Sequence, residues 1–215
     1  MDQNLKQDLI HYWRNKNIIL DERVISAFEN IPREIFLPEE FQEEAYHDHP
    51  LPTLRHQSIS QPTTIMIMLQ ALEVQEGDSV LEIGSGVGYQ AALLTQLVGS
   101  NGNIVTMEII PELIQASKIH LQQLRITNIL VIEGDGSRGF PEKAPFDKII
   151  LTAACPTIPK TLLDQLKIGG TIVAPVGDAE SQTMVKGIKK EKGLDLEFLG
   201  EFRFVPLRGR FGFED

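Results

Sequence analysis

Short apolar segments alternate with helix-like segments through the middle of this 215-residue chain. Five segments are apolar over nearly their whole length, as strands covered on both faces are. They are SVLEI from residue 79, NIVTM from 103, NILVI from 128, DKIIL from 147 and TIVAPV from 171. Helical patterns at residues 89–98, 111–124 and 159–166 separate most of them, and Lys167-Ile168-Gly169-Gly170 is expected to end the last helix. This alternation predicts an α/β fold with a mostly parallel sheet and helices on both faces.

The two ends of the chain follow other patterns. Apolar residues at helical spacing predict one short helix across residues 5–13 and a second from Asp21 to Asn30. Five prolines between residues 32 and 62 exclude a long helix there, and residues 63–72 return to an apolar helical pattern. After Gly177, two strand-like segments around a Lys-Gly turn predict a C-terminal antiparallel hairpin.

Composition limits the compartment and the partners. A formal net charge of −10 opposes nucleic-acid binding, which depends on Lys and Arg contacts to phosphate, and we interpret the basic cluster at residues 186–192 as a solvated hairpin. One cysteine, Cys155, excludes an intramolecular disulfide and fits a reducing compartment. We see no signal peptide and no apolar run near the ~18 residues of a membrane span. We therefore expect a soluble cytoplasmic protein with no membrane or nucleic-acid partner.

The stretch LEIGSGVGYQ, residues 81–90, places three glycines directly after an apolar segment. In a dinucleotide-binding fingerprint the third glycine lies three residues after the second. Tyr89 occupies that position here, and Gly88 comes one residue too early. Glu82 is expected to put a negative charge beside the turn, which disfavours phosphate and favours a cation. An NAD-dependent oxidoreductase is therefore a weaker alternative.

Two further acidic residues follow the next two strands. Glu108 lies about 20 residues beyond the turn, where an acid can accept a hydrogen bond from a ribose diol. Asp135, within Gly134-Asp135-Gly136, can accept from an adenine amino group. Each acid taken singly is also a common cap or turn residue. Open α/β sheets bind ligands at the rim where these segments are expected, and the combination favours S-adenosylmethionine: an adenine, a ribose diol, a cation and no phosphate.

Other segments accompany the glycine turn and the Gly134-Asp135-Gly136 loop. They are DERV (21–24), IPREIFLP (31–38), AYHD (45–48), QSISQP (57–62), APFD (144–147), TAA (152–154), LKIGG (166–170), PVG (175–177) and RFVPL (203–207). In this order they resemble the protein-L-isoaspartate O-methyltransferases, which use S-adenosylmethionine to methylate the abnormal carboxylate of isoaspartyl residues in aged proteins. The resemblance covers nearly the whole chain, and the SISQP and RFVPL segments are its most specific parts.

The resemblance implies a Rossmann-like methyltransferase fold with a seven-stranded sheet, acting on isoaspartyl proteins and peptides as a monomer. It implies one domain with an N-terminal helical and active-site segment (1–75), a cofactor-binding core (76–178) and a C-terminal hairpin and tail (179–215). Ser60 is the expected catalytic residue. The expected cofactor-binding residues are Gln57, Ser58, Ile59, Ser60, Glu82, Gly84, Ser85, Gly86, Gly88, Glu108, Ile109, Asp135 and Gly136. The expected substrate-binding residues are Ser60, Val205, Pro206 and Leu207, and no metal is expected.

A carboxylate acceptor is already ionised at pH 7, so the reaction requires no general base. Thr53-Leu54-Arg55-His56 stands where members of the family usually carry a glycine-containing segment, which leaves a related methyltransferase of another carboxylate as an alternative. A module that retains the fold without catalysis is a third. His56 could act as an acid or base, although we interpret it as a partly exposed structural residue. We interpret Cys155 as a small buried hydrophobic residue.

Overall fold

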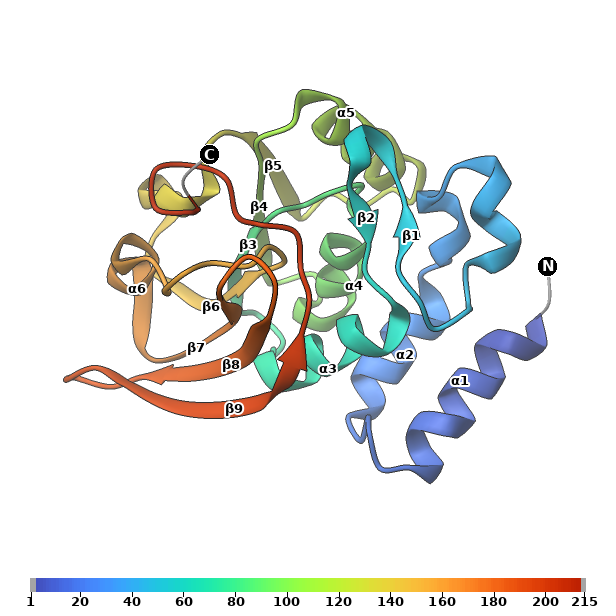
Figure 1. Ribbon diagram of the computed structural model, residues 1–215, viewed down its shortest axis with the longest axis horizontal. Helices are drawn as coiled ribbons and strands as arrows, with labels where there is room; N and C mark the ends of the chain where they lie inside the picture. The colour runs from blue at the N-terminus through green and yellow to red at the C-terminus, as the bar shows by residue number, and fades with distance from the viewer. Residues whose placement is uncertain (1–2, 214–215) are drawn as a thin grey trace.

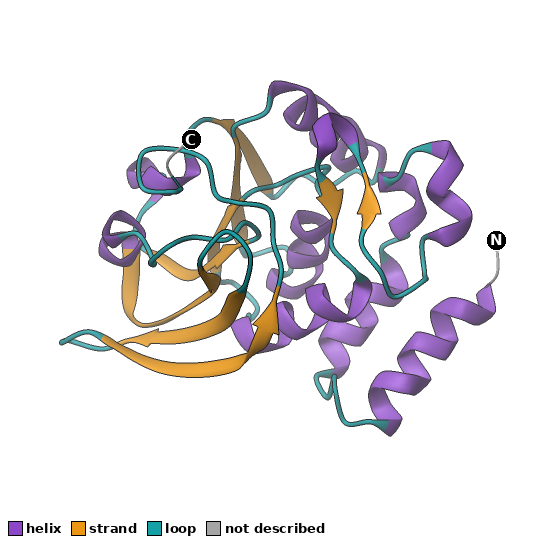
Figure 2. Ribbon diagram, in the orientation of Figure 1, coloured by secondary structure: helices purple, strands orange, loops and turns teal. Residues whose placement is uncertain are grey.

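A seven-stranded sheet forms the centre of the computed structural model, which describes residues 3–213 (Figures 1 and 2). The strands lie in the order β5-β4-β3-β6-β7-β8-β9. Their bounds are β3 (Ser79–Ile83), β4 (Asn103–Glu108), β5 (Ile129–Glu133), β6 (Phe146–Leu151), β7 (Leu166–Gly177), β8 (Gln182–Lys189) and β9 (Leu194–Phe202). The first five strands in this order, from β5 through β3 to β7, pair in parallel with their neighbours. β8 pairs antiparallel with β7, and β9 pairs antiparallel with β8. The expected parallel sheet with a C-terminal hairpin is confirmed.

Six α-helices surround this sheet among residues 3–213. They are α1 (Gln3–Asn15), α2 (Glu22–Asn30), α3 (Pro62–Leu72), α4 (Tyr89–Val98), α5 (Pro111–Gln123) and α6 (Lys160–Gln165). The Asp21 side chain accepts a hydrogen bond from Arg23 N and caps α2. Pro62 and Pro111 stand in the first turn of α3 and α5, where the missing amide hydrogen removes no intrahelical bond. The helices expected on both sides of the glycine turn are therefore present.

Both faces of the sheet are buried. Neighbouring residues of a strand point to opposite faces. Val80 packs in a core with residues from α1 to α5, whereas Leu81 packs in a second core with Leu162 of α6 and Leu207 of the C-terminal tail. This arrangement explains why the central strands are apolar at almost every position.

The end of α6 differs from expectation. The glycines of LKIGG do not end this helix, which stops at Gln165, and residues 166–170 are the first part of β7. Leu166 is buried and paired with Phe146, and the register shifts before the next pair, Lys148 with Thr171. Gly169, whose φ is +81°, lies in this irregular first part of β7. Burial of Leu166 against the sheet edge thus outweighs the local helix-ending signal.

The C-terminal hairpin is present at the edge of the sheet, and β9 ends at Phe202. Two of its lysines contact other parts of the fold. Lys186 Nζ lies 2.6 Å from Glu73 Oε1, and Lys189 Nζ donates to the carbonyl of Leu163 at 2.5 Å. These contacts hold the hairpin against α3 and α6. No helix among residues 3–213 is long and apolar enough to cross a membrane.

Strand β3 lies at the point where the chain changes direction along the sheet. β4 and β5 follow it on one side, whereas β6 and β7 lie on the other. The glycine turn leaves the carboxyl end of β3 at this switch point, where open α/β sheets bind ligands. A small hairpin, β1 (Leu51–Pro52) and β2 (Ser58–Ile59), lies beside α5 (Figure 1).

The expected negative charge of Glu82 beside the turn is wrong at neutral pH. The Glu82 side chain is completely buried in the sheet, and Thr106 Oγ1 on β4 donates a hydrogen bond to its Oε2. Burial raises the pKa of Glu82 to about 8, since a carboxylate loses its hydration there. Glu82 therefore carries a proton at pH 7 and belongs to the interior of the sheet.

The raised pKa of Glu82 predicts a specific pH dependence of stability. The folded protein keeps a proton up to about pH 8 that the unfolded chain loses near pH 4.5, the ordinary glutamate value. The contribution of Glu82 to the free energy of unfolding is therefore fully present below pH 4.5 and falls as the pH rises toward 8, by at most about 1.4 kcal/mol per pH unit. Urea denaturation of the wild type and Glu82→Gln at pH 5, 6.5 and 8 measures it.

Glu82→Gln places a neutral amide of the same shape in the sheet and does not titrate. We expect the stability of the wild type to fall relative to this variant between pH 5 and pH 8. Other titrating groups cancel in the difference. A difference that does not change with pH would show that Glu82 is ionised throughout this range.

Candidate active site

A cavity of about 410 Å³ lies at the carboxyl ends of β3 and β4, within the size range of small-molecule sites. The glycine turn after β3 forms one wall. The β1–β2 hairpin, including the turn η3 (Leu54–His56), forms another, and residues 205–208 of the C-terminal tail form a third. Three segments far apart in sequence thus meet at the rim of the sheet.

Most of the residues expected at the site line this cavity. They are Gln57, Ser58, Ile59, Ser60, Gly84, Ser85, Gly86, Glu108, Ile109, Gly136, Val205, Pro206 and Leu207. Glu82, Gly88 and Asp135 do not line it. The tail reaches the rim because Ala154 N donates to Val205 O at 2.8 Å and Leu207 N donates to Ala154 O at 2.7 Å. These two bonds fasten residues 205–207 beside the end of β6.

Glu108 joins the glycine turn to the start of α5. It is 8% exposed, and its Oε2 accepts a hydrogen bond from Gly86 N at 2.9 Å. Its Oε1 accepts from Ile109 N at 2.8 Å and from Ile110 N at 3.1 Å. A carboxylate has about four acceptor sites, so roughly one remains for a hydroxyl group. This acid therefore shapes the cavity wall and keeps acceptor capacity for a ligand.

Gly88 packs two helices together instead of lining the cavity. It precedes α4 with a φ of +94°, and a Cβ atom there would lie 2.8 Å from Ser117 Oγ and 3.3 Å from Ser117 Cα of α5. A side chain would therefore both strain the backbone and separate α4 from α5. The sequence pattern identified the turn, but which of its glycines face the cavity depends on where α5 packs.

Asp135, a third expected cofactor residue that does not line the cavity, is held by the loop and the tail. Its carboxylate accepts four hydrogen bonds: from Ser137 N at 3.0 Å, Ser137 Oγ at 2.6 Å, Arg138 Nε at 3.3 Å and Arg210 N at 2.9 Å. These donors use its acceptor capacity and lower its pKa, against the opposing effect of partial burial. In this conformation Asp135 anchors the C-terminal tail, and Gly134 and Gly136 on either side of it line the cavity.

Arg33 holds the segment that carries Ser60. Its guanidinium is completely buried, and it donates to the carbonyl of Ser60 at 2.8 Å and to that of Ala45 at 2.7 Å. Burial lowers the pKa of Arg33 to about 10, and the ring of Tyr89 lies 5.5 Å from the guanidinium carbon. Arg33 lies within the IPREIFLP segment, but only the folded chain brings it under Ser60.

The turn η3 carries the residues that replace the family's glycine-containing segment. Arg55 and His56 both have a φ of +57°, a left-handed conformation that costs a residue with a Cβ roughly 1–2 kcal/mol. Arg55 Nε donates to Glu112 Oε1 of α5 at 2.8 Å. This exposed ion pair offsets part of that cost. His56 is exposed and lines the cavity.

Tyr89 and Gln90 are two of the cavity residues that were missed from the sequence. Tyr89 and Gln90 follow the glycine turn, and their Oη and Nε2 atoms are buried without a hydrogen-bond partner among the described residues. Unpaired buried polar atoms are rare in folded proteins, and one beside a cavity is available to a ligand or to water. Polar groups in the first turn of α4, directly after the glycine turn, were the available signal. Cys155, by contrast, is buried outside the cavity wall, and burial raises its pKa to about 12.

Comparisons with known proteins agree with this geometry. The profile of the protein-L-isoaspartate(D-aspartate) O-methyltransferase family matches residues 3–212. Protein-L-isoaspartate O-methyltransferase 2 of Archaeoglobus fulgidus is 41% identical over 214 residues, which cover 100% of this chain and 98% of that protein. The enzyme of Methanococcoides burtonii is 44% identical over 194 residues, covering 90% and 95%.

Solved structures agree as well. A protein-L-isoaspartate O-methyltransferase superposes with a TM-score of 0.87 at 30% identity, covering 99% of this chain and 67% of that chain. A putative enzyme of the same kind from Plasmodium falciparum, in complex with S-adenosyl-L-homocysteine, has a TM-score of 0.81 at 22% identity, covering 94% and 97%. The chain belongs to the protein-L-isoaspartate(D-aspartate) O-methyltransferase family.

Proposed function

We propose that the rim cavity binds S-adenosylmethionine and an isoaspartyl carboxylate side by side, with Ser60 at the point of methyl transfer. The enzyme is an S-adenosylmethionine-dependent carboxyl O-methyltransferase of isoaspartyl residues. The observation that carries the assignment of the site is the meeting of Ser60, the glycine turn and residues 205–207 in one cavity. A dehydrogenase or a non-catalytic module does not explain this combination.

The protein has little acid–base chemistry to perform. S-adenosylmethionine supplies an electrophilic methyl carbon on a sulfonium, which leaves as a neutral thioether. The acceptor carboxylate is ionised at neutral pH, so the chain has only to orient it and to exclude water. The Ser60 hydroxyl has no hydrogen bond to the described residues, and it can donate to one carboxylate oxygen while the other attacks. Val205, Pro206 and Leu207 supply an apolar wall for the peptide.

The residues of the cavity fit the cofactor. Glu108 offers an acceptor to a ribose hydroxyl, and the buried amide of Gln90 offers a donor to the carboxylate of the methionine part. Gly84, Ser85 and Gly86 allow close approach to the backbone. Glu82 adds no charge to this site, and Asp135 acts through the loop that it holds.

We further propose that the chain forms one methyltransferase domain and works as a cytoplasmic monomer. In this domain the N-terminal segment ends at residue 75 and the cofactor-binding core ends at residue 178. Residues 1 and 215, the outer boundaries of that domain, lie outside the described range. The shared central sheet and a single buried cysteine support this proposal. Sedimentation analysis and cell fractionation test it directly.

The first prediction for the proposed site concerns Glu108. Glu108→Ala is expected to weaken S-adenosylmethionine binding by about 1–3 kcal/mol, because the ribose loses a charged acceptor and the turn loses its anchor. Calorimetric titration measures the change. Glu133→Ala is the matched control. Glu133 on β5 is the register partner of Glu108 on β4, but it is exposed and lies outside the cavity wall. Equal affinities in the two variants would remove Glu108 from the cofactor site.

The second prediction separates turnover from cofactor binding. Ser60→Ala is expected to lower kcat for an isoaspartyl peptide by roughly 10–1000-fold, because one preorganised donor is lost, while affinity for S-adenosylmethionine changes little. Methyl-ester formation and calorimetry measure the two quantities. The same peptide with a normal aspartyl residue is the substrate control, and Ser100→Ala, in the exposed turn after α4, is the protein control.

Two results would overturn this role for Ser60. One is an equal loss of kcat and of cofactor affinity. The other is a rise of kcat near neutral pH that His56→Ala abolishes, which would assign the chemistry to His56. With an ionised acceptor and Ser60 as the orienting donor, kcat is expected to stay nearly flat above a pH of about 4 until another group titrates.

The third prediction treats Arg33 as a positioning residue. Arg33→Met removes both hydrogen bonds to the backbone and is expected to lower kcat by about 10-fold or more, since an error of about 1 Å in position can cost 100-fold. Arg33→Lys keeps the charge and one donor and should recover part of kcat. Kinetics give kcat and KM, and thermal unfolding reports stability. A lowered Tm with kcat unchanged would show that Arg33 only stabilises the fold.

A further inference from the structure

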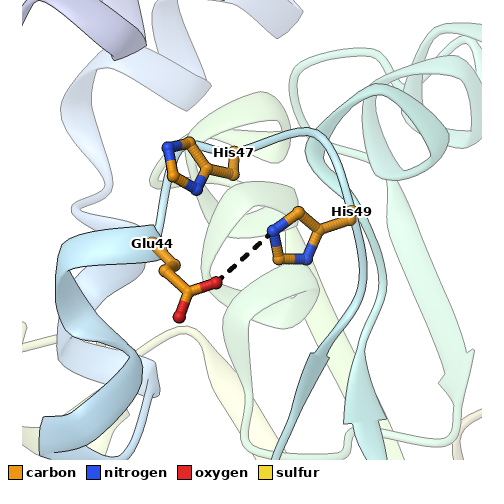
Figure 3. A group of neighbouring side chains, drawn as sticks. All are labelled: Glu44, His47 and His49. Atoms are coloured by element: carbon orange, nitrogen blue, oxygen red, sulfur yellow. Dashed lines mark ion pairs between the residues drawn. The ribbon is translucent and has the colours of Figure 1, made fainter.

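A second group of chemically active side chains lies outside the cavity. The loop between η2 (Glu39–Glu44) and β1 brings together Glu44, His47 and His49, whose side chains are shown in Figure 3. One ligand atom from each lies within 4.8 Å of the others. Glu44 is half-buried and the two histidines are exposed, and none of the three lines the cavity.

The spacing of these atoms is close to that of a metal site. Metal–ligand distances of 2.0–2.1 Å around tetrahedral zinc place the ligand atoms about 3.3 Å apart. His49 Nε2 lies 3.5 Å from Glu44 Oε2, as the dashed line in Figure 3 marks. His47 would have to approach by at most about 1.5 Å, a shift that rotation of an exposed side chain provides.

The other nitrogen of His49 already has the partner typical of a metal ligand. His49 Nδ1 lies 3.1 Å from the carbonyl oxygen of Pro50. A carbonyl oxygen can only accept, so Nδ1 carries the proton in this bond and the lone pair of the neutral ring is on Nε2. Histidines that bind metals commonly donate their second ring N–H to a backbone carbonyl, which fixes the tautomer. Nε2, the atom facing Glu44, is therefore the one prepared to bind a cation.

The backbone of the loop is held by contacts that do not involve a metal. Asp48, between the two histidines, accepts from Thr63 N at 2.9 Å and from Thr63 Oγ1 at 2.6 Å at the start of α3. His47 N donates to Glu44 O at 2.9 Å, and His49 N donates to His47 O at 2.9 Å. The backbone positions that carry the three ligands are thus set in advance, which lowers the entropy lost on binding.

The donor set and the charge favour one class of ion. Two imidazoles and one carboxylate suit Zn²⁺ and neighbouring transition metals, whereas Mg²⁺ and Ca²⁺ prefer oxygen ligands alone. Glu39, Glu40 and Glu43 precede the site in the same segment, and the chain carries a net charge of −10. This negative field attracts a divalent cation.

We propose that Glu44, His47 and His49 form a site for one divalent transition-metal ion of the Zn²⁺ class. The three side chains leave a fourth coordination position for water or another ligand. The loop continues directly into β1, which pairs with β2 just before Ser60. A bound ion would therefore fasten the base of the hairpin that covers the cavity.

The test is a titration of the untagged, full-length protein with Zn²⁺ after treatment with a chelator. We expect one ion per chain, with an increase in Tm, because binding to the folded state alone stabilises it. His47→Gln and His49→Gln should each weaken binding by at least about 10-fold, the lower limit for losing even an outer partner of a metal ligand. His11→Gln is the matched control, since His11 is an exposed histidine on α1 outside the group.

Cobalt and magnesium complete the experiment. Co²⁺ bound by two imidazoles and a carboxylate should give a visible absorption band in the wild type that both variants lose, and excess Mg²⁺ should not displace Zn²⁺. Equal Zn²⁺ affinity in the wild type and both variants would overturn the proposal. So would a failure of the wild type to take up Zn²⁺, because the group would then be an ion pair between His49 and Glu44 alone.

Discussion

Strand β3 is paired on both edges and covered on both faces, and this constraint decides where polar chemistry can occur. After Ser79, its buried positions hold only apolar side chains or, at Glu82, an acid that keeps its proton. Its backbone is released only at the carboxyl end, where the glycine turn begins. Because β4 and β6 lie on opposite sides of it, the helices diverge there and leave the cavity between them.

Segments from both ends of the chain complete that cavity. The hairpin carrying Ser60 is held from below by Arg33 and from the side by the ion pair of Arg55 with Glu112. The tail is held through Ala154 and through Asp135. The core therefore supplies the cavity wall that we propose for the cofactor, while the two terminal segments supply the residues that we propose orient the acceptor. The proposed metal site lies at the base of the same hairpin, outside the cavity.

The sequence was sufficient for most of the fold. Continuous apolar strands, capped helices and the early third glycine are local signals, and they led to the sheet, the hairpin and the choice of cofactor. The expectation that the glycines of LKIGG end α6 was wrong, because the pairing of buried Leu166 with Phe146 is a long-range interaction. Local patterns report the helix-ending glycines but not the strand partner that competes with them.

The site divides in the same way. The turn glycines and Glu108 were proposed from local motifs and spacing, and Ser60 was proposed from the family resemblance; all of them except Gly88 line the cavity. The neutral state of Glu82 could not be predicted in this way, because it depends on burial of the side chain inside the folded sheet. The packing role of Gly88 and the full occupation of the Asp135 carboxylate depend on groups distant in sequence, Ser117 and Arg210. The hydrogen bond from Arg33 to the carbonyl of Ser60 also joins residues distant in sequence, so the sequence did not predict it. Residue types and spacing thus determine which chemistry is available, whereas packing determines which groups are charged, which are exposed and which reach the cavity.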